Sequence, residues 1–294
     1  VVDNSLSIQS FSERLRSQFS QLMTVLRSTR GGLPDVHIGV ITPDMGSAPY
    51  NIPSCEDPDG GVLQRGEGGA CANPVGQPYI VDVEAAGFTI ERDATLDRCV
   101  EHDCTAANCL PAAFPHSGSL TTEPEGLVLV EDGNGCPRCR NYAGEPLETV
   151  FGCVADLGVN GCGFEQHFAA VKAALTTAKA QNDGFLRSEA YLAVVFVTDE
   201  DDCSVSDPEM FNPASGELGP LTSFRCTRYG ITCTEAWPAD GETQSTRLHD
   251  GVPRSEADPE RRLLAVEEME RFLVGLKGGA DRVLVQMIAG RHSG

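Results

Sequence analysis

The chain opens on Val1-Val2-Asp3-Asn4-Ser5-Leu6-Ser7, and this stretch decides the predicted fold. Two β-branched residues are typical of a strand, and a periodic apolar pattern follows from about Ser10. Alternate side chains of an extended segment point the same way, so Asp3, Ser5 and Ser7 can converge on one point. A carboxylate and two hydroxyls suit a hard divalent cation such as Mg2+ or Ca2+. The alternative is a turn with a helix cap, where Ser and Asp are also preferred.

The remaining chain alternates predicted helices with predicted strands. Helical periodicity is expected over residues 10–28, from about residue 164 to 175, and over 259–277. Apolar runs at 36–42, 191–198 and 282–289 predict strands. This alternation indicates an α/β fold with a mostly parallel sheet covered by helices on both faces.

Two segments interrupt this pattern. Residues 43–150 are rich in Gly and Pro and hold seven of the twelve cysteines, so we expect a long disulfide-stapled insertion, with candidate strands at 79–83 and 126–130. Residues 203–257 form a second loop-rich segment. We therefore expect a single domain over residues 1–294. Since the chain opens inside a strand, we also expect a fragment, with an export signal and possible lipid anchor upstream.

Composition restricts the compartment and the partners. Twelve cysteines, an even number, indicate disulfides and an extracytoplasmic location, in the periplasm, on the outer membrane surface or secreted. The formal net charge is −21, with 43 acidic against 22 basic residues. Such a charge argues against nucleic acid and anionic membranes as partners.

Polar side chains follow two of the predicted strands. Asp3, Ser5 and Ser7 follow the first strand, and Asp199 follows the strand at 191–198. Ligands of open α/β sheets bind beyond the carboxyl ends of the strands, so both groups are expected at one edge. The sequence therefore predicts a divalent cation site there.

These motifs, in this order, resemble a von Willebrand factor A-type domain, of the cysteine-rich kind found in predicted surface lipoproteins of myxobacteria and their relatives. The resemblance rests on residues 3–7, the strand at 37–42, Gly161-Cys162-Gly163-Phe164-Glu165-Gln166 before a helix, residues 197–204, and the strand at 283–288. It covers the chain apart from the insertion. It implies an exported, non-catalytic adhesion domain that engages a protein or surface polymer through a metal ion.

The resemblance also implies a ligand set, which matches at all but one position. Asp3, Ser5, Ser7 and Asp199 carry over, with Mg2+, Ca2+ or Mn2+ as the ion and an acidic side chain of the partner completing the coordination. The family's threonine has no counterpart, because Val159 or Asn160 stands there. Either Asn160 or water substitutes, or the affinity is reduced, or the site no longer functions.

Other readings of the sequence remain open. A structural surface protein with a degenerate metal site is favoured by Val159. Cys136 and Cys139 have the spacing of a redox dithiol, and a zinc site is conceivable from Cys99, Cys104, Cys109, His102 and His116. Asp199, Asp201, Asp202 and Asp207 lack the Gly and Glu of an EF-hand loop. Common hydrolase and phosphate-loop motifs are absent, so no enzymatic activity is expected. We assign Glu165 and Gln166 only to the helix N-terminus.

Overall fold

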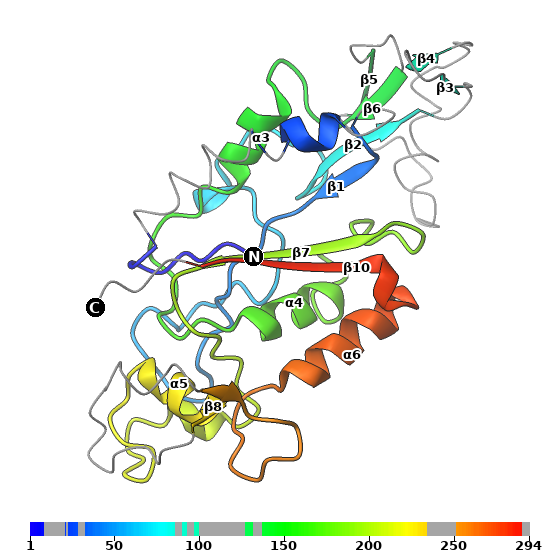
Figure 1. Ribbon diagram of the computed structural model, residues 1–294. Coiled ribbons are helices and arrows are strands. Elements are labelled where there is room, and N and C mark those ends of the chain that lie inside the picture. Colours follow the sequence, from blue (N-terminus) through cyan, green and yellow to red (C-terminus); the bar gives the residue numbers. More distant parts are fainter. Residues whose placement is uncertain are drawn as a thin grey trace.

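The computed structural model describes residues 1–8, 21, 23–28, 33–85, 90–92, 97–99, 127–131, 137–233 and 251–289. The fold is mixed α/β (Figure 1). The α-helices are α3 (Leu147–Val154), α4 (His167–Leu175), α5 (Phe224–Gly230) and α6 (Val266–Lys277), with short 3-10 helices η1 (Glu67–Gly69), η3 (Pro208–Phe211) and η5 (Ala280–Arg282). The strands are β1 (Val36–Ile38), β2 (Ile80–Glu84), β3 (Ile90–Arg92), β4 (Asp97–Cys99), β5 (Val128–Glu131), β6 (Pro137–Arg140), β7 (Leu192–Thr198), β8 (Ile231–Thr232), β9 (Val252–Pro253) and β10 (Val283–Ala289).

The largest sheet is antiparallel, so the expected mostly parallel sheet is not what the strand pairing shows. Its four strands have the order β1-β2-β6-β5. Three of them, β2, β5 and β6, come from the cysteine-rich segment. Two ion pairs join β2 to β6, because the buried Asp82 carboxylate contacts Arg138 and Arg140 at 2.6 and 2.9 Å. The candidate strands at 79–83 and 126–130 correspond to β2 and β5.

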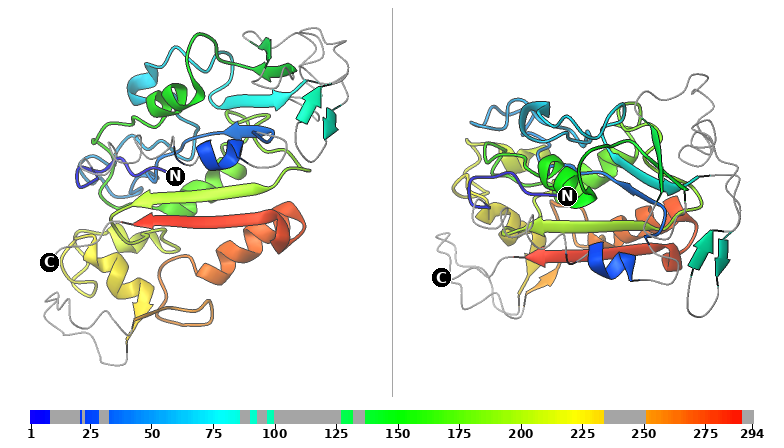
Figure 2. Two further views of the ribbon diagram at one scale, coloured as in Figure 1. Left: turned by 45° about the horizontal axis from the view of Figure 1, so that its top comes forward. Right: turned by 90° about the horizontal axis from the view of Figure 1, so that it is seen from above.

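The predicted strands at 191–198 and 282–289 form a parallel pair. The register runs from Val283 opposite Leu192 to Ala289 opposite Thr198. Both strands therefore end at the same edge of the molecule (Figure 2). The smaller pairs β3-β4 and β8-β9 are antiparallel.

Residues 1–3 lie between β7 and the segment that follows β1. The Val2 amide donates to the carbonyl of Ile41 at 2.9 Å, and the Asp3 amide donates to that of Val197 at 3.0 Å. Val2 also forms a parallel bridge with Val197. The opening stretch thus runs beside β7 on one side and beside the segment that follows β1 on the other.

Helices cover both faces of these strands. Alternate β2 side chains point to opposite faces, which separates Val81 and Val83 from Ile80. Val81 and Val83 belong to a cluster with α4, α6 and β7, and these two helices lie side by side in Figure 1. Ile80 belongs to a second cluster, with Val2, α3 and the helical residues 23–27.

One predicted helix lies largely outside the described residues, and another begins later than predicted. Of the helix expected over 10–28, only residue 21 and residues 23–28 are described, of which 21 and 23–27 are helical. The helix expected from residue 259 begins at Val266, because the preceding backbone pairs elsewhere: the Ser206 amide donates to Arg262 and the Leu264 amide donates to Ser204.

Three disulfides are defined within the described residues: Cys55–Cys162, Cys71–Cys153 and Cys203–Cys226. The first two tie the start of the cysteine-rich segment to the region around α3 and before α4. Disulfides are consistent with an oxidising, extracytoplasmic compartment. In the part of the chain that the structure describes, no helix is both long and apolar enough to cross a lipid bilayer.

Candidate metal centre

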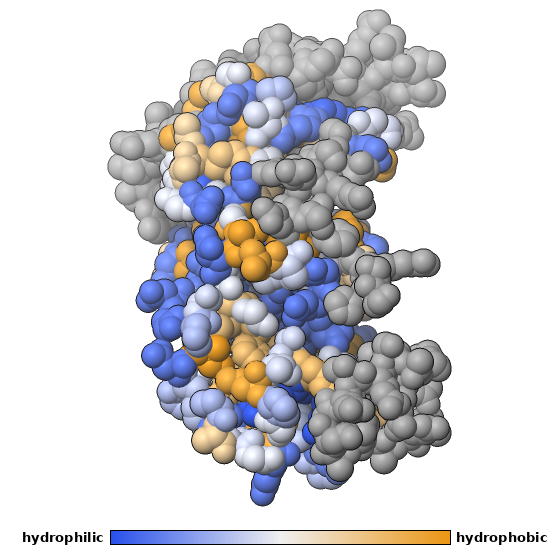
Figure 3. All heavy atoms as spheres, turned by 90° about the vertical axis from the view of Figure 1, so that its left-hand side faces the viewer, coloured by the Kyte–Doolittle hydropathy of each residue, from blue (hydrophilic) through white to orange (hydrophobic). Residues whose placement is uncertain are grey.

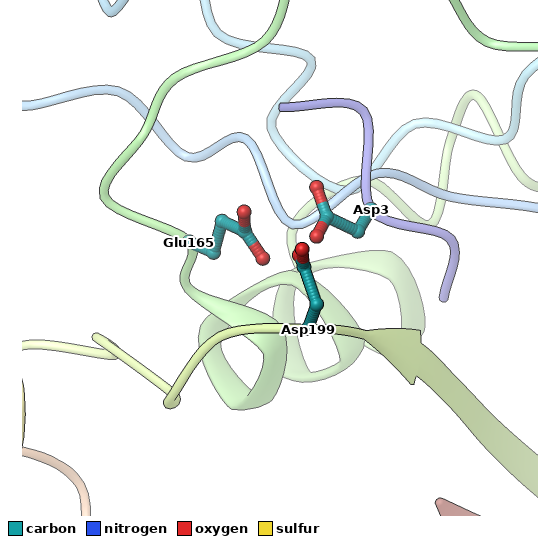
Figure 4. Close-up of side chains that lie close together, drawn as sticks. All are labelled: Asp3, Glu165 and Asp199. Atoms are coloured by element: carbon teal, nitrogen blue, oxygen red, sulfur yellow. The ribbon is translucent and has the colours of Figure 1, made fainter. Parts of the chain in front are cut away.

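Three carboxylates from distant parts of the chain meet at the edge where β7 ends. They belong to Asp3, Glu165 and Asp199, and one oxygen of each lies within 4.8 Å of the others (Figure 4). Asp3 lies in the opening stretch, Glu165 precedes α4, and Asp199 follows β7 directly. Two oxygens bound to one Ca2+ at about 2.3–2.6 Å are at most about 5 Å apart, so the spacing fits a single ion.

The two predicted serines lie beside this cluster. The Ser5 and Ser7 hydroxyl oxygens are 2.9 Å apart, and the Ser7 hydroxyl donates to Asp199 Oδ1 at 3.1 Å. The Ser5 amide donates to Asp3 Oδ1 at 2.7 Å, a bond that turns the chain after Asp3. The structure therefore brings together Asp3, Ser5, Ser7 and Asp199, four of the five residues that the sequence proposed.

A buried threonine hydroxyl connects two of the carboxylates. Thr198 Oγ1 lies 3.0 Å from Glu165 Oε2 and 3.4 Å from Asp3 Oδ2. One hydroxyl carries one proton, so it can donate to only one of these oxygens at a time. Thr198 can therefore satisfy only one of these two carboxylate oxygens at a time.

Burial and mutual repulsion change the protonation of this pair. Burial, followed by the nearby Glu165 charge, raises the pKa of Asp3 to about 8. Burial together with Glu165, Asp199 and Asp201 also raises the pKa of Glu200, to about 7. Burial opposes the charge of Glu165, but contacts with His167, Asp3 and Ser5 outweigh it and lower the pKa of Glu165. A bound cation would therefore act mainly on Asp3, by favouring its ionised form.

His167, the first residue of α4, links the cluster to the loop after β7. Its ring lies between two carboxylates, with Nε2 3.4 Å from Glu165 Oε2 and Nδ1 3.7 Å from Asp202 Oδ1. Burial opposes the charged form, but Asp202 and Glu165 outweigh it and raise the pKa of His167 to about 9. The cationic imidazole thus offsets part of the negative charge of Glu165 and Asp202.

The loop before α4 packs closely against the opening stretch. The Gly161 amide donates to the Asn4 carbonyl at 2.8 Å, and a Cβ at Gly161 would overlap the Asn4 side-chain amide. Asn160, the fifth proposed ligand, is exposed next to this contact. Its role as a ligand stays a prediction.

Glu165 is the residue that sequence reasoning missed, because it was assigned to the helix N-terminus. The Gln166 side chain makes no capping hydrogen bond to α4, and Glu165 points at the cluster instead (Figure 4). The sequence does contain a signal for this ligand. Glu165 is an acidic residue shortly after the Gly161–Gly163 loop, close to where the resemblance places the threonine ligand.

The other acidic residues after β7 have partners within the protein. Asp202 accepts from the Phe168 amide and from the Ser204 hydroxyl, at 3.1 and 2.7 Å. Asp207 caps η3 and contacts Arg262 at 2.6 Å. Asp201 accepts from the Thr227 hydroxyl. These contacts give Asp201, Asp202 and Asp207 a structural role within the protein.

The two cysteine-based readings fall largely outside the described residues. Cys136, His102, Cys104, Cys109 and His116 lie there, as does the side chain of Cys99. Cys139 is wholly buried in β6 and is disulfide-bonded. A buried disulfide sulfur is typical of a structural bridge.

The face beyond the carboxyl ends of β7 and β10 mixes hydrophilic and hydrophobic residues (Figure 3).

Comparison with known proteins found no match among family models, curated proteins or solved structures.

Proposed function

We propose that this protein is an exported, non-catalytic binding domain that holds a divalent cation at the Asp3, Glu165 and Asp199 centre and engages a protein or surface polymer through it. The observation that carries the proposal is the convergence of these carboxylates with the Ser5 and Ser7 hydroxyls. Oxygen donors of this kind are the ligands that Mg2+ and Ca2+ prefer.

A von Willebrand A-like arrangement is part of the proposal. It is supported by the backbone bonds of residues 1–3 to both Ile41 and Val197, which run the opening stretch parallel to β7. It is also supported by helices on both faces of the strands. In that arrangement β1, the opening stretch, β7 and β10 would be neighbours in one sheet.

The test is the thermal unfolding midpoint of the oxidised protein in EDTA and in millimolar Mg2+, Mn2+ or Ca2+. A ligand at about 100 times its Kd stabilises the folded state by about 2.7 kcal/mol, which corresponds to about 4 °C for a chain of this length. We expect a rise of this size for the wild-type chain. Asp3→Asn, which keeps the shape of the side chain and removes its charge, should abolish the rise.

Two controls separate specific binding from general screening of the negative charge. Asp183→Asn makes the same chemical change at an exposed residue and should keep the full rise. NaCl at matched ionic strength should reproduce only a small part of it. A wild-type midpoint that does not respond to any of the three cations would refute the proposal.

The second candidate function is a structural surface domain without a working ion site. The exposed Asn160 and the missing threonine ligand favour it. Under this candidate the core and the disulfides would stabilise the fold without an ion, and neither wild type nor Asp3→Asn would change its midpoint when cations are added.

A further inference from the structure

A third carboxylate at the centre changes what the bound ion can attract. Expectations from the sequence placed two carboxylates there, Asp3 and Asp199, with hydroxyls completing the set. Glu165 adds a negative charge on a wholly buried side chain. The inference drawn here rests on the proposed function and specifies its ion and its ligand.

Within the described part of the chain, one oxygen of Glu165 has no hydrogen-bond partner. Oε2 lies 3.0 Å from the Thr198 hydroxyl, whereas Oε1 is buried and none of the described residues donates a hydrogen bond to it. The carboxylate faces Asp3 and Asp199 in Figure 4. A buried carboxylate oxygen without a donor is costly, and a cation at the centre would remove that cost.

The backbone around Glu165 is fixed on both sides. The Glu165 carbonyl accepts from the Cys203 amide at 2.6 Å. The Gln166 amide donates to Pro43 at 2.9 Å, and the Gln166 side chain donates to Gly46 at 2.7 Å. Glu165 is therefore held in place before any ion binds, as expected for a preorganised ligand.

Charge and coordination number then decide the preferred ion. Mg2+ usually retains several waters and takes one or two carboxylates, whereas Ca2+ accepts six to eight oxygens in flexible geometry. Three carboxylates and two serine hydroxyls suit the larger ion. With all three carboxylates ionised, the ion and these ligands carry one net negative charge, and the cationic His167 next to Glu165 is itself paired with Asp202. The filled site therefore attracts a further carboxylate less than a site with two carboxylates would.

We propose that Glu165 is a direct ligand of this centre, that the resident ion is Ca2+, and that the ion's open position takes a neutral oxygen donor, such as the hydroxyl of a surface polymer, in place of an acidic side chain. This revises the partner chemistry expected from the sequence.

The experiment is isothermal titration of the EDTA-stripped, oxidised full chain with CaCl2 and with MgCl2. Glu165→Gln should raise the Kd for Ca2+ at least about tenfold, because one charged ligand is lost. Glu270→Gln makes the same change on the exposed side of α6 and should alter the Kd less than about twofold. Unfolding of each variant in EDTA confirms that it is folded.

Acetate serves as a small carboxylate probe in a second series. Saturating acetate should leave the Ca2+ affinity of the wild-type chain unchanged or reduced. Glu165→Thr lowers the negative charge, so acetate should strengthen its cation binding and the preference for Ca2+ over Mg2+ should shrink. The acetate measurement on wild type tests the proposal even where a variant fails to fold.

The outcomes separate the two proposals. Absence of cation binding by wild type would overturn the proposed function and the inference together. Cation binding that Glu165→Gln weakens no more than Glu270→Gln, tighter binding of Mg2+ than Ca2+, or acetate that strengthens Ca2+ binding to wild type, would overturn the inference alone.

Discussion

At the scale of single residues, the ionised Asp3 carboxylate destabilises the folded protein when no ion is bound, because it is buried next to Glu165. Burial and the Glu165 charge raise the pKa of Asp3 to about 8, from 3.8 in the unfolded chain. The folded state therefore disfavours the ionised carboxylate. The associated stability is fully present below pH 4 and is lost as the pH rises through about 8.

This sign leads to an unusual expectation for Asp3→Asn. In EDTA at pH 8–9 the variant should be more stable than wild type, by at least about 1 kcal/mol, because the costly ionisation is gone. With saturating Ca2+ the order should reverse. Urea denaturation under both conditions provides the measurement. A variant that is less stable in EDTA at this pH would show that Asp3 is stabilising without an ion.

At the scale of elements, the centre depends on a close contact between the opening stretch and the loop before α4. The Gly161 amide bonds to the Asn4 carbonyl, and the space beside Gly161 is filled by the Asn4 side chain. Close backbone approach of this kind tolerates only glycine.

Gly161→Ala should consequently destabilise the protein by about 1–3 kcal/mol, since overpacking forces neighbouring groups to move. It should also weaken cation binding, because Asn4 lies next to Asp3. Gly163→Ala is the matched control, as a Cβ there meets nothing within 4 Å. Equal urea midpoints and equal Ca2+ affinities for the two variants would contradict the role of this contact.

The sequence predicted β7 and β10 well because both are continuous apolar runs, and a parallel pair brings their carboxyl ends together. The same reasoning placed Asp3, Ser5, Ser7 and Asp199 at one edge. Glu165 was not predicted because its contacts with Thr198 and Asp3 span 33 residues or more, and no local pattern encodes them. The predicted start of α6 was wrong because the backbone of residues 262–264 forms hydrogen bonds with the backbone of residues 204–206 and is not helical.

At the scale of the whole molecule, two disulfides tie the start of the cysteine-rich segment to the rest of the fold, at different distances from the centre. Cys55–Cys162 is next to it, because the Cys162 amide donates to Asp44 and Gly161 contacts Asn4. Cys71–Cys153 joins that segment to α3, in the second core cluster.

Removing each disulfide should therefore have separable effects. Cys71→Ser with Cys153→Ser should reduce the free energy of unfolding by about 2–4 kcal/mol and leave the Ca2+ affinity nearly unchanged. Cys55→Ser with Cys162→Ser should reduce both. Urea denaturation and calorimetric titration of each double variant provide the comparison, and loss of Ca2+ affinity in the first variant alone would contradict this division.

The pairing of residues 1–3 with β7 has a consequence for biosynthesis. The amino group of Val1 bonds to the Val195 carbonyl, 194 residues further along the chain. Asp3 leaves the ribosome well before Asp199, so the opening stretch must wait for β7 before it can pair. The three carboxylates meet only after this long-range pairing has formed, so uptake of the ion would report that the two ends of the centre have come together.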